Sequence, residues 1–189
     1  MIALAKKVSE REFSQAYADV VICAIPDQLT PWSQFSALQD REKRFPLTPP
    51  VDSRVAQFWH GFLCLTNLGR MAVLMPPTAL IGPDGTALLR YLIDHNYLQA
   101  VVELPACADR QSAPESMPLL LLVDKRKADT RLALIGPERG LSGTGYQDRH
   151  VLAAFDDWQG HRSNMHLHAS DTSAVAQQGY QVMAPFVRG

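Results

Sequence analysis

The amino-acid sequence predicts an α/β fold with a largely parallel sheet and helices on both faces. Short apolar, β-branched runs alternate with segments whose apolar residues recur at helical spacing. Two links between a helix and the next strand, at Gly69-Arg70 and Asn96-Tyr97, are short enough for right-handed crossovers. Another apolar run follows its predecessor with no helical segment between them. One strand is therefore expected to be antiparallel.

The first strand is predicted at residues 19–25, a continuous apolar run typical of a strand covered on both faces. Prolines and charged residues fill 27–52, which is expected to be a long loop. The first helix is predicted after this loop, because its apolar residues recur at helical spacing. Asp52 or Ser53 is expected to cap it, because both residue types are favoured at the N-cap. Gly69 is expected to end that helix.

The middle of the chain is predicted to hold four strands and one helix. The second strand covers 71–75 and stops at two prolines. An Asp-Gly pair opens a helix over 84–96, which carries one apolar stripe and closes at an asparagine. Three apolar runs, 98–104, 119–123 and 131–135, are the third, fourth and fifth strands.

Two helices are predicted to complete the chain. Asp148 is expected to cap the first, whose apolar residues continue to Trp158, and the second covers about 171–178. We divide the chain into an N-terminal extension, 1–18, and one domain, 19–189.

Composition excludes several classes of protein. The chain has 189 residues, enough for one domain, with 18 basic and 19 acidic residues. This balance gives no general attraction to nucleic acid. No apolar run reaches the roughly 18 residues of a membrane helix. Cys23, Cys64 and Cys107 are widely spaced in apolar sequence, so we expect buried free thiols in the cytoplasm and no metal site.

Several isolated features have both a functional and a structural interpretation, and we favour the structural one. The basic turn Lys125-Arg126-Lys127 is a candidate nucleic-acid contact, although such turns are commonly solvated. The others are a possible phosphate loop at Gly140–Tyr146, possible metal ligands His161, His166 and His168, the carboxylate pair Asp156-Asp157, and the loop aromatics Trp32 and Phe35.

The sequence resembles the methylase subunits of type I restriction-modification systems, which are adenine-N6 DNA methyltransferases, over roughly 17–186. The similar segments are Gly69–Pro76, Leu80–Ile93, Leu98–Pro105 with its final Leu-Pro, Met117–Lys125 and the closing Ala174–Val182. This resemblance implies the C-terminal half of an S-adenosylmethionine-dependent methyltransferase sheet, which is Rossmann-like. It also implies the spatial order first, second, fourth, third strand.

The catalytic motif of this family falls at the end of the first strand. There, Asn-Pro-Pro and an aromatic residue bind the amino group of a flipped adenine and stack on its ring. This sequence has Ala24, Ile25, Pro26 and Asp27 at those positions. Ala24 offers no carbonyl acceptor and Asp27 no aromatic ring, so the resemblance implies a degenerate site.

The resemblance also concerns the cofactor. In the family, three strands that precede the catalytic strand hold S-adenosylmethionine, whereas 18 residues precede Asp19 here. We therefore expect no bound cofactor.

These observations predict a pseudoenzyme, a non-catalytic methyltransferase-like interaction protein or remnant linked to a restriction-modification or mobile-element system. Its partner would be a second copy, or a methylase or specificity subunit, bound through the exposed edge of strand 19–25. Two alternatives stay open. One is half of a split adenine-N6 methyltransferase complemented in trans, and the other is a DNA-binding accessory factor.

Overall fold

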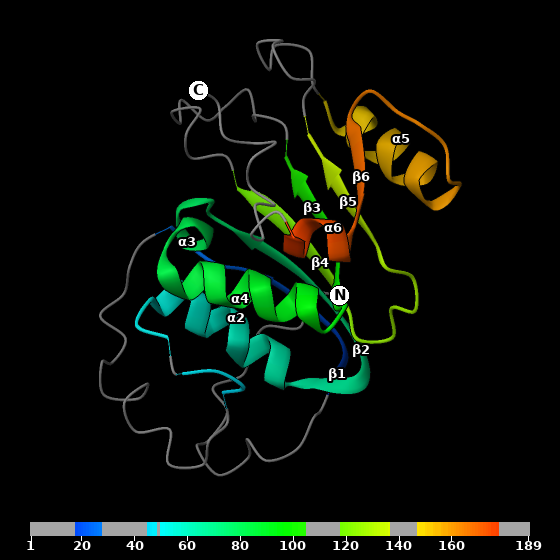
Figure 1. Cartoon of the computed structure of the whole chain (residues 1–189). Helices are drawn as coiled ribbons and strands as arrows, with labels where there is room; N and C mark the ends of the chain where they lie inside the picture. The colour runs from blue at the N-terminus through cyan, green and yellow to red at the C-terminus, as the bar shows by residue number, and fades with distance from the viewer. Residues whose placement is uncertain (1–17, 28–44, 49, 105–117, 137–146, 178–189) are drawn as a thin grey trace.

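The computed structural model describes residues 18–27, 45–48, 50–104, 118–136 and 147–177. They form a six-stranded sheet with helices on both faces (Figure 1). The strands are β1 (Ala18–Ala24), β2 (Leu65–Met75), β3 (Leu98–Glu103), β4 (Leu119–Asp124), β5 (Arg131–Ile135) and β6 (Leu167–Asp171). The helices are α2 (Ser53–Leu63), α3 (Thr78–Ile81), α4 (Pro83–Asp94), α5 (Asp148–Gln159) and α6 (Thr172–Gln177).

The strand order is β1-β2-β4-β3-β5-β6, which confirms the order predicted for the first four strands. β1 is parallel to β2 and β3 is parallel to β5, whereas β4 is antiparallel to both of its neighbours, as predicted. The sequence analysis missed β6, which runs antiparallel to β5. Three of the five pairings are therefore antiparallel, and the sheet is less parallel than predicted.

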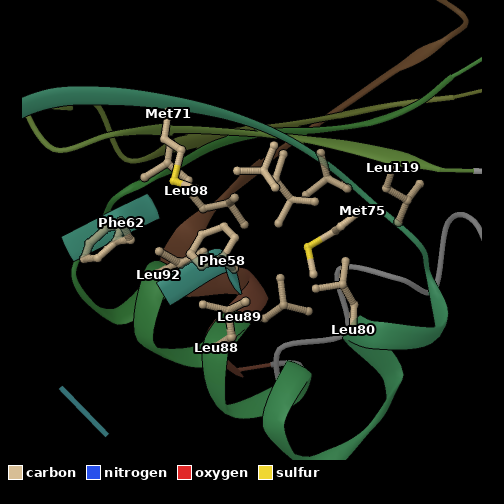
Figure 2. Packing of buried hydrophobic residues seen from close by; sticks show 14 of the residues in the cluster. Phe58, Phe62, Met71, Met75, Leu80, Leu88, Leu89, Leu92, Leu98 and Leu119 are labelled. Atoms are coloured by element: carbon tan, nitrogen blue, oxygen red, sulfur yellow. The ribbon is translucent and has the colours of Figure 1, made fainter. Parts of the chain in front are cut away.

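The main core lies between the sheet and the helices α2, α3, α4 and α6 (Figure 2). Its side chains are apolar and almost fully buried; the largest include Phe58, Trp59, Met71, Met75, Leu88, Leu92, Leu98 and Leu121. On the opposite face, α5 packs Ala154 and Trp158 against β3 and β5 in a second, smaller cluster. The two faces are thus covered to very different extents.

The first helix is shorter than predicted, because Gly69 lies inside β2 and does not end the helix. Cys64 caps α2, and the chain then enters β2 at Leu65, which is 1% exposed. Lys125 stabilises this junction, because its Nζ donates to the carbonyl oxygens of Phe62 and Leu65, both at 3.2 Å. This distant lysine could not be assigned to the junction from local sequence.

Other local signals are confirmed or shifted by a residue. Asp52 caps α2, and its Oδ1 accepts from the Arg54 backbone N–H at 2.8 Å. Asn96 has a φ of 56°, the left-handed conformation suited to the residue after a helix. The cap of α5 is Gln147, one residue before the predicted Asp148.

Of the predicted buried free thiols, two lie in the described residues, and both are free but only half-buried. Cys23 and Cys64 are free and half-buried, and burial raises the pKa of both thiols. Several predicted features lie outside the described residues: Cys107, Trp32, Phe35, the Gly140–Tyr146 segment and residues 1–17 of the N-terminal extension.

Candidate functional site at the end of β1

The four positions that the resemblance aligns with the family's motif, Ala24 to Asp27, lie where β1 leaves the sheet. Ala24 ends the strand with its side chain exposed. Ile25 turns inward, being 7% exposed, and its N–H donates to the carbonyl of Leu74 at 2.7 Å. Pro26 and Asp27 follow on the surface. The parallel register of β1 and β2 brings this end beside Pro76-Pro77, where β2 also ends.

Asp27 is held by two residues from other elements. Its Oδ1 is 3.2 Å from Arg54 Nη1 and 3.2 Å from Thr78 Oγ1. Arg54 lies in the first turn of α2 and Thr78 begins α3. A further hydrogen bond of 2.8 Å, from Arg54 Nη1 to Thr78 Oγ1, closes the triangle. We call these three residues the β1-end cluster.

Arg54 is the functional-site residue that sequence reasoning missed. Its side chain is only 9% exposed, and its Nη2 lies 2.7 Å from Asp52 Oδ2. The hydrogen bond to Asp52 is the main reason that the pKa of Arg54 is raised. Burial alone would raise the pKa of Asp52, but the hydrogen bonds from Arg54 outweigh burial and lower it. The sequence feature that could have identified Arg54 is its position: it is a basic residue two positions after the capping Asp52, on an otherwise apolar helix face.

The electrostatics around the β1-end cluster are acidic overall. Asp84 Oδ2 accepts from the backbone N–H groups of Val51 and Asp52, both at 2.7 Å. Arg54 forms ion pairs with Asp27 and Asp52, and Asp84 lies against the adjacent backbone of Val51 and Asp52. Among the described residues at this end of β1, carboxylates therefore outnumber cations, which disfavours phosphate groups.

The polar side chains at this end of the sheet bond to one another through Arg54. Among the strands that the structure describes, β1 is the sheet edge. The expectation that the chain binds no S-adenosylmethionine stays a prediction.

The predicted nucleic-acid turn lies at the opposite end of the sheet. Lys125 donates its backbone N–H to Gly69, near the start of β2, far from Asp27 at the end of β1. Lys125 Nζ also lies 4.3 Å from the centre of the Phe62 ring. Burial lowers the pKa of Lys125. This lysine is thus engaged in stabilising the fold.

The other two basic residues of this turn have different surroundings. Lys127 Nζ donates to Asn96 Oδ1 and to the carbonyl of Leu98, both at 2.9 Å. Burial lowers the pKa of Lys127 to about 8. Arg126 is more exposed and lies near the buried carboxylate of Asp124. Nucleic-acid contact by this turn stays a prediction.

Three of the remaining candidates have structural partners in the described chain. Arg131 donates to Nδ1 of His161 at 2.9 Å, and Nδ1 of His166 lies 3.3 Å from the carbonyl of Gly136. Asp157 accepts from Arg162 and Asn164, each at 2.7 Å. In the part of the chain that the structure describes, no three His, Cys, Asp or Glu side chains are placed to hold a metal ion.

Within the described residues, no helix is both long enough and apolar enough to cross a membrane.

The fold and the end of β1 together define a Rossmann-like sheet of the kind found in S-adenosylmethionine-dependent methyltransferases. The profile of the N-6 DNA Methylase family matches residues 1–138. The chain therefore belongs to the N-6 DNA methylase family. No protein of curated function matches the sequence.

Solved structures agree on the fold. The chain is similar to the methyltransferase subunit of a Streptococcus thermophilus type I restriction-modification system, with a TM-score of 0.67 and 19% identity over 89% of this chain. A chain from another type I restriction-modification complex gives a TM-score of 0.61 and 16% identity over 90%. The M protein of the type I enzyme EcoKI gives 0.52 and 18% over 78%.

These relatives are much longer. The matched region is 37% of the Streptococcus thermophilus subunit, 38% of the second chain and 31% of the EcoKI M protein. At these identities the similarity establishes the shared fold.

Proposed function

We propose that this chain is a non-catalytic, methyltransferase-like interaction protein associated with a restriction-modification or mobile-element system. The β1-end cluster is the observation that carries this proposal. Asp27, which stands at the position of the family's aromatic residue, is engaged by Arg54 and Thr78.

Adenine methylation needs two chemical functions at this position. A side-chain carbonyl must accept the amino hydrogens of the base, and an aromatic ring must stack on it. Ala24 supplies only a methyl group, and Asp27 supplies a carboxylate that forms an ion pair. The excess of carboxylates over cations among the described residues of this site adds repulsion toward a DNA backbone. These features support a role in binding protein rather than in methyl transfer.

Half of a split adenine-N6 methyltransferase is the second candidate. The outer edge of β1 favours it, because that edge lacks a strand partner among the described residues and would suit strand addition from another chain. Ala24 argues against it, because a complementing chain would not restore the missing acceptor. The third candidate, a DNA-binding accessory factor, is disfavoured by the net charge of −1.

Calorimetry with S-adenosylmethionine tests the proposal directly. The full chain at high concentration is expected to give no heat of binding, whereas a complete type I methyltransferase subunit serves as the positive control. Micromolar binding would overturn the proposal and favour the enzyme.

A companion titration with fluorescent duplex DNA at about 50 mM and about 200 mM salt separates the third candidate. An accessory factor would bind DNA with an affinity that falls steeply as salt is added. We expect no binding at either concentration.

A further inference from the structure

One face of the sheet is apolar and only half covered by helix. In a sheet, residues paired across strands project to the same side. The register therefore places seven apolar side chains on the α5 side of the three strands β1, β2 and β4. We call them the open face: Val20, Ile22, Ala24, Ala72, Leu74, Leu120 and Leu122.

The open face is exposed where it meets the sheet edge. Ile22 is 80% exposed and Val20 is 61% exposed, while Ala72 and Leu74 on β2 are half-buried. The alternate residues of the same strands, which face α2 and α4, are between 0% and 2% exposed; they are Met71, Val73, Met75, Leu121 and Val123. The contrast shows that helices cover one side of these strands fully. On the other side, Leu120 and Leu122 pack partly against the α5 cluster, and Val20 and Ile22 stay exposed.

Among the described helices, α5 alone lies on the side of the open face (Figure 1). It covers β3 and β5, where Trp158 and Ala154 pack on Val102 and Ile135. It leaves β1 and β2 without a helix above them. α5 therefore forms a step beside the open face.

Among the described residues of β1, β2 and β4, the open face carries no unpaired charge that would oppose a second apolar surface. Its only charged neighbours in register are Arg70 and Asp124, which form an ion pair of 2.7 Å with each other. Asp19, the one charged residue of β1, is turned toward β2, where it accepts from Thr66 Oγ1 at 2.9 Å. Natural sheet edges are usually protected by charges or by a covering element. This edge has neither at its centre in the described chain.

We infer that a second copy of this chain covers the open face, in a two-fold symmetric dimer in which the two open faces pack against each other. The inference rests on the proposed role as an interaction protein and names the partner. An uncharged apolar patch is complementary to an identical patch, as a two-fold interface requires. The symmetry axis runs roughly along the strands, over the middle of the open face.

The step formed by α5 fits this arrangement. Packed sheets lie about 10 Å apart, and a helix is about 10–12 Å across. A second sheet and α5 therefore make layers of the same height above the first sheet. The two-fold axis places each β1 edge against the flank of the partner's α5, so that the exposed edge is covered together with the face.

The buried area is sufficient for a dimer. Three strands about 4.8 Å apart, each contributing about five residues at about 3.3 Å per residue, span roughly 240 Å² per copy. The 12-residue α5 is about 18 Å long and about 10 Å wide. Each of the two contacts between a β1 edge and the partner's α5 therefore buries roughly 180 Å² on the edge and roughly 180 Å² on the helix. Both copies together bury about 1,200 Å², at the lower end of the range for specific interfaces.

Simple edge-to-edge pairing of two β1 strands is less favourable. It would satisfy the backbone groups of the edge but would leave the half-buried Ala72 and Leu74 as exposed as before. Face-to-face packing buries all three strands, because the contact covers their full width.

The test is the mass of the full chain in solution, measured by light scattering after gel filtration. A dimer is expected for the wild type, and Ile22→Lys should shift it to a monomer at the same concentration. Ile81→Lys is the matched control. Ile81 is also an exposed apolar residue, at 64%, but it lies on α3, across the sheet from the open face. The control is expected to stay dimeric.

Further variants separate the arrangements. Ala72→Lys should also give a monomer if the faces pack together, whereas an edge-to-edge dimer would tolerate it. Val20→Asp is a second test at the rim, and circular dichroism verifies that each variant is folded. A monomeric wild type, or a dimer that survives Ile22→Lys or Ala72→Lys, overturns the inference. Either result leaves the proposed function standing, because that function is tested separately by S-adenosylmethionine binding.

Discussion

Gly85, near the start of α4, lies against the backbone of α3 more closely than any other described glycine lies against its neighbours. This close approach gives a quantitative prediction. Gly85 lies in the first turns of α4 and is buried. A Cβ at this position would stand 2.1 Å from the carbonyl oxygen of Ala79 and 2.5 Å from Cα of Leu80. Both contacts are with backbone, so no side-chain rotation relieves them. Gly85→Ala must therefore push the two helices apart by about 1 Å, since ordinary contacts exceed about 3.2 Å.

The expected loss of stability follows from two opposing effects. Overpacking a well-packed site costs about 1–3 kcal/mol, and a backbone obstruction belongs at the upper end. Alanine is favoured over glycine inside a helix by about 1 kcal/mol. The net loss for Gly85→Ala is expected to be about 2 kcal/mol.

Gly82→Ala is the matched control. No atom lies within 4 Å of a Cβ at Gly82, the N-cap residue of α4, and its φ of −69° suits alanine. The weaker capping by alanine and the smaller entropy of the unfolded chain oppose each other, so the change should stay within about 0.5 kcal/mol.

Urea unfolding followed by tryptophan fluorescence measures both variants, because Trp59 and Trp158 are buried. With a slope of about 2 kcal/mol per molar urea, Gly85→Ala should lower the midpoint by about 1 M. Equal midpoints for Gly85→Ala and the wild type would refute the close approach of α3 and α4.

Two further predictions concern the charged groups. Arg54→Met should lower the free energy of unfolding by about 2 kcal/mol, because it leaves partly buried carboxylates without their cation. Asp27→Asn should change the free energy of unfolding by less than about 1 kcal/mol, because the Asp27 side chain is 62% exposed. Similar losses for the two variants in urea unfolding would argue against Arg54 as the organising residue. The pKa of Lys127 is about 8 in the folded chain and near 10.5 when unfolded, so the unfolded chain holds an extra proton between these values. The stabilisation linked to this proton is complete above pH 10.5 and is lost as the pH falls through 8. The free energy of unfolding of the wild type, relative to that of Lys127→Met, should therefore rise between pH 8 and pH 10. If the difference between the two proteins stayed constant over this range, Lys127 would not be desolvated.

Local patterns in the sequence were sufficient for most of the central fold. The apolar runs of β3, β4 and β5 and the stripe of α4 were predicted close to their observed bounds, because burial on both faces or on one helical face requires those periodicities. For β2 only the C-terminal part, 71–75, was predicted, and the strand begins six residues earlier at Leu65. The order of the first four strands followed from the resemblance to the methylase family. The positions Ala24 to Asp27 were also located from sequence alone.

The tertiary structure decided the features that depend on partners distant in the chain. β6 is a polar, largely exposed segment whose only reason to be a strand is its pairing with β5. Lys125 stabilises the α2–β2 junction about 60 residues away, and Arg54 bonds to Asp27, which lies 27 residues earlier in the chain. The open face likewise exists only because α5 lies over β3 and β5. An apolar run predicts that a strand is buried, but the element that covers it is determined by packing, which no local pattern encodes.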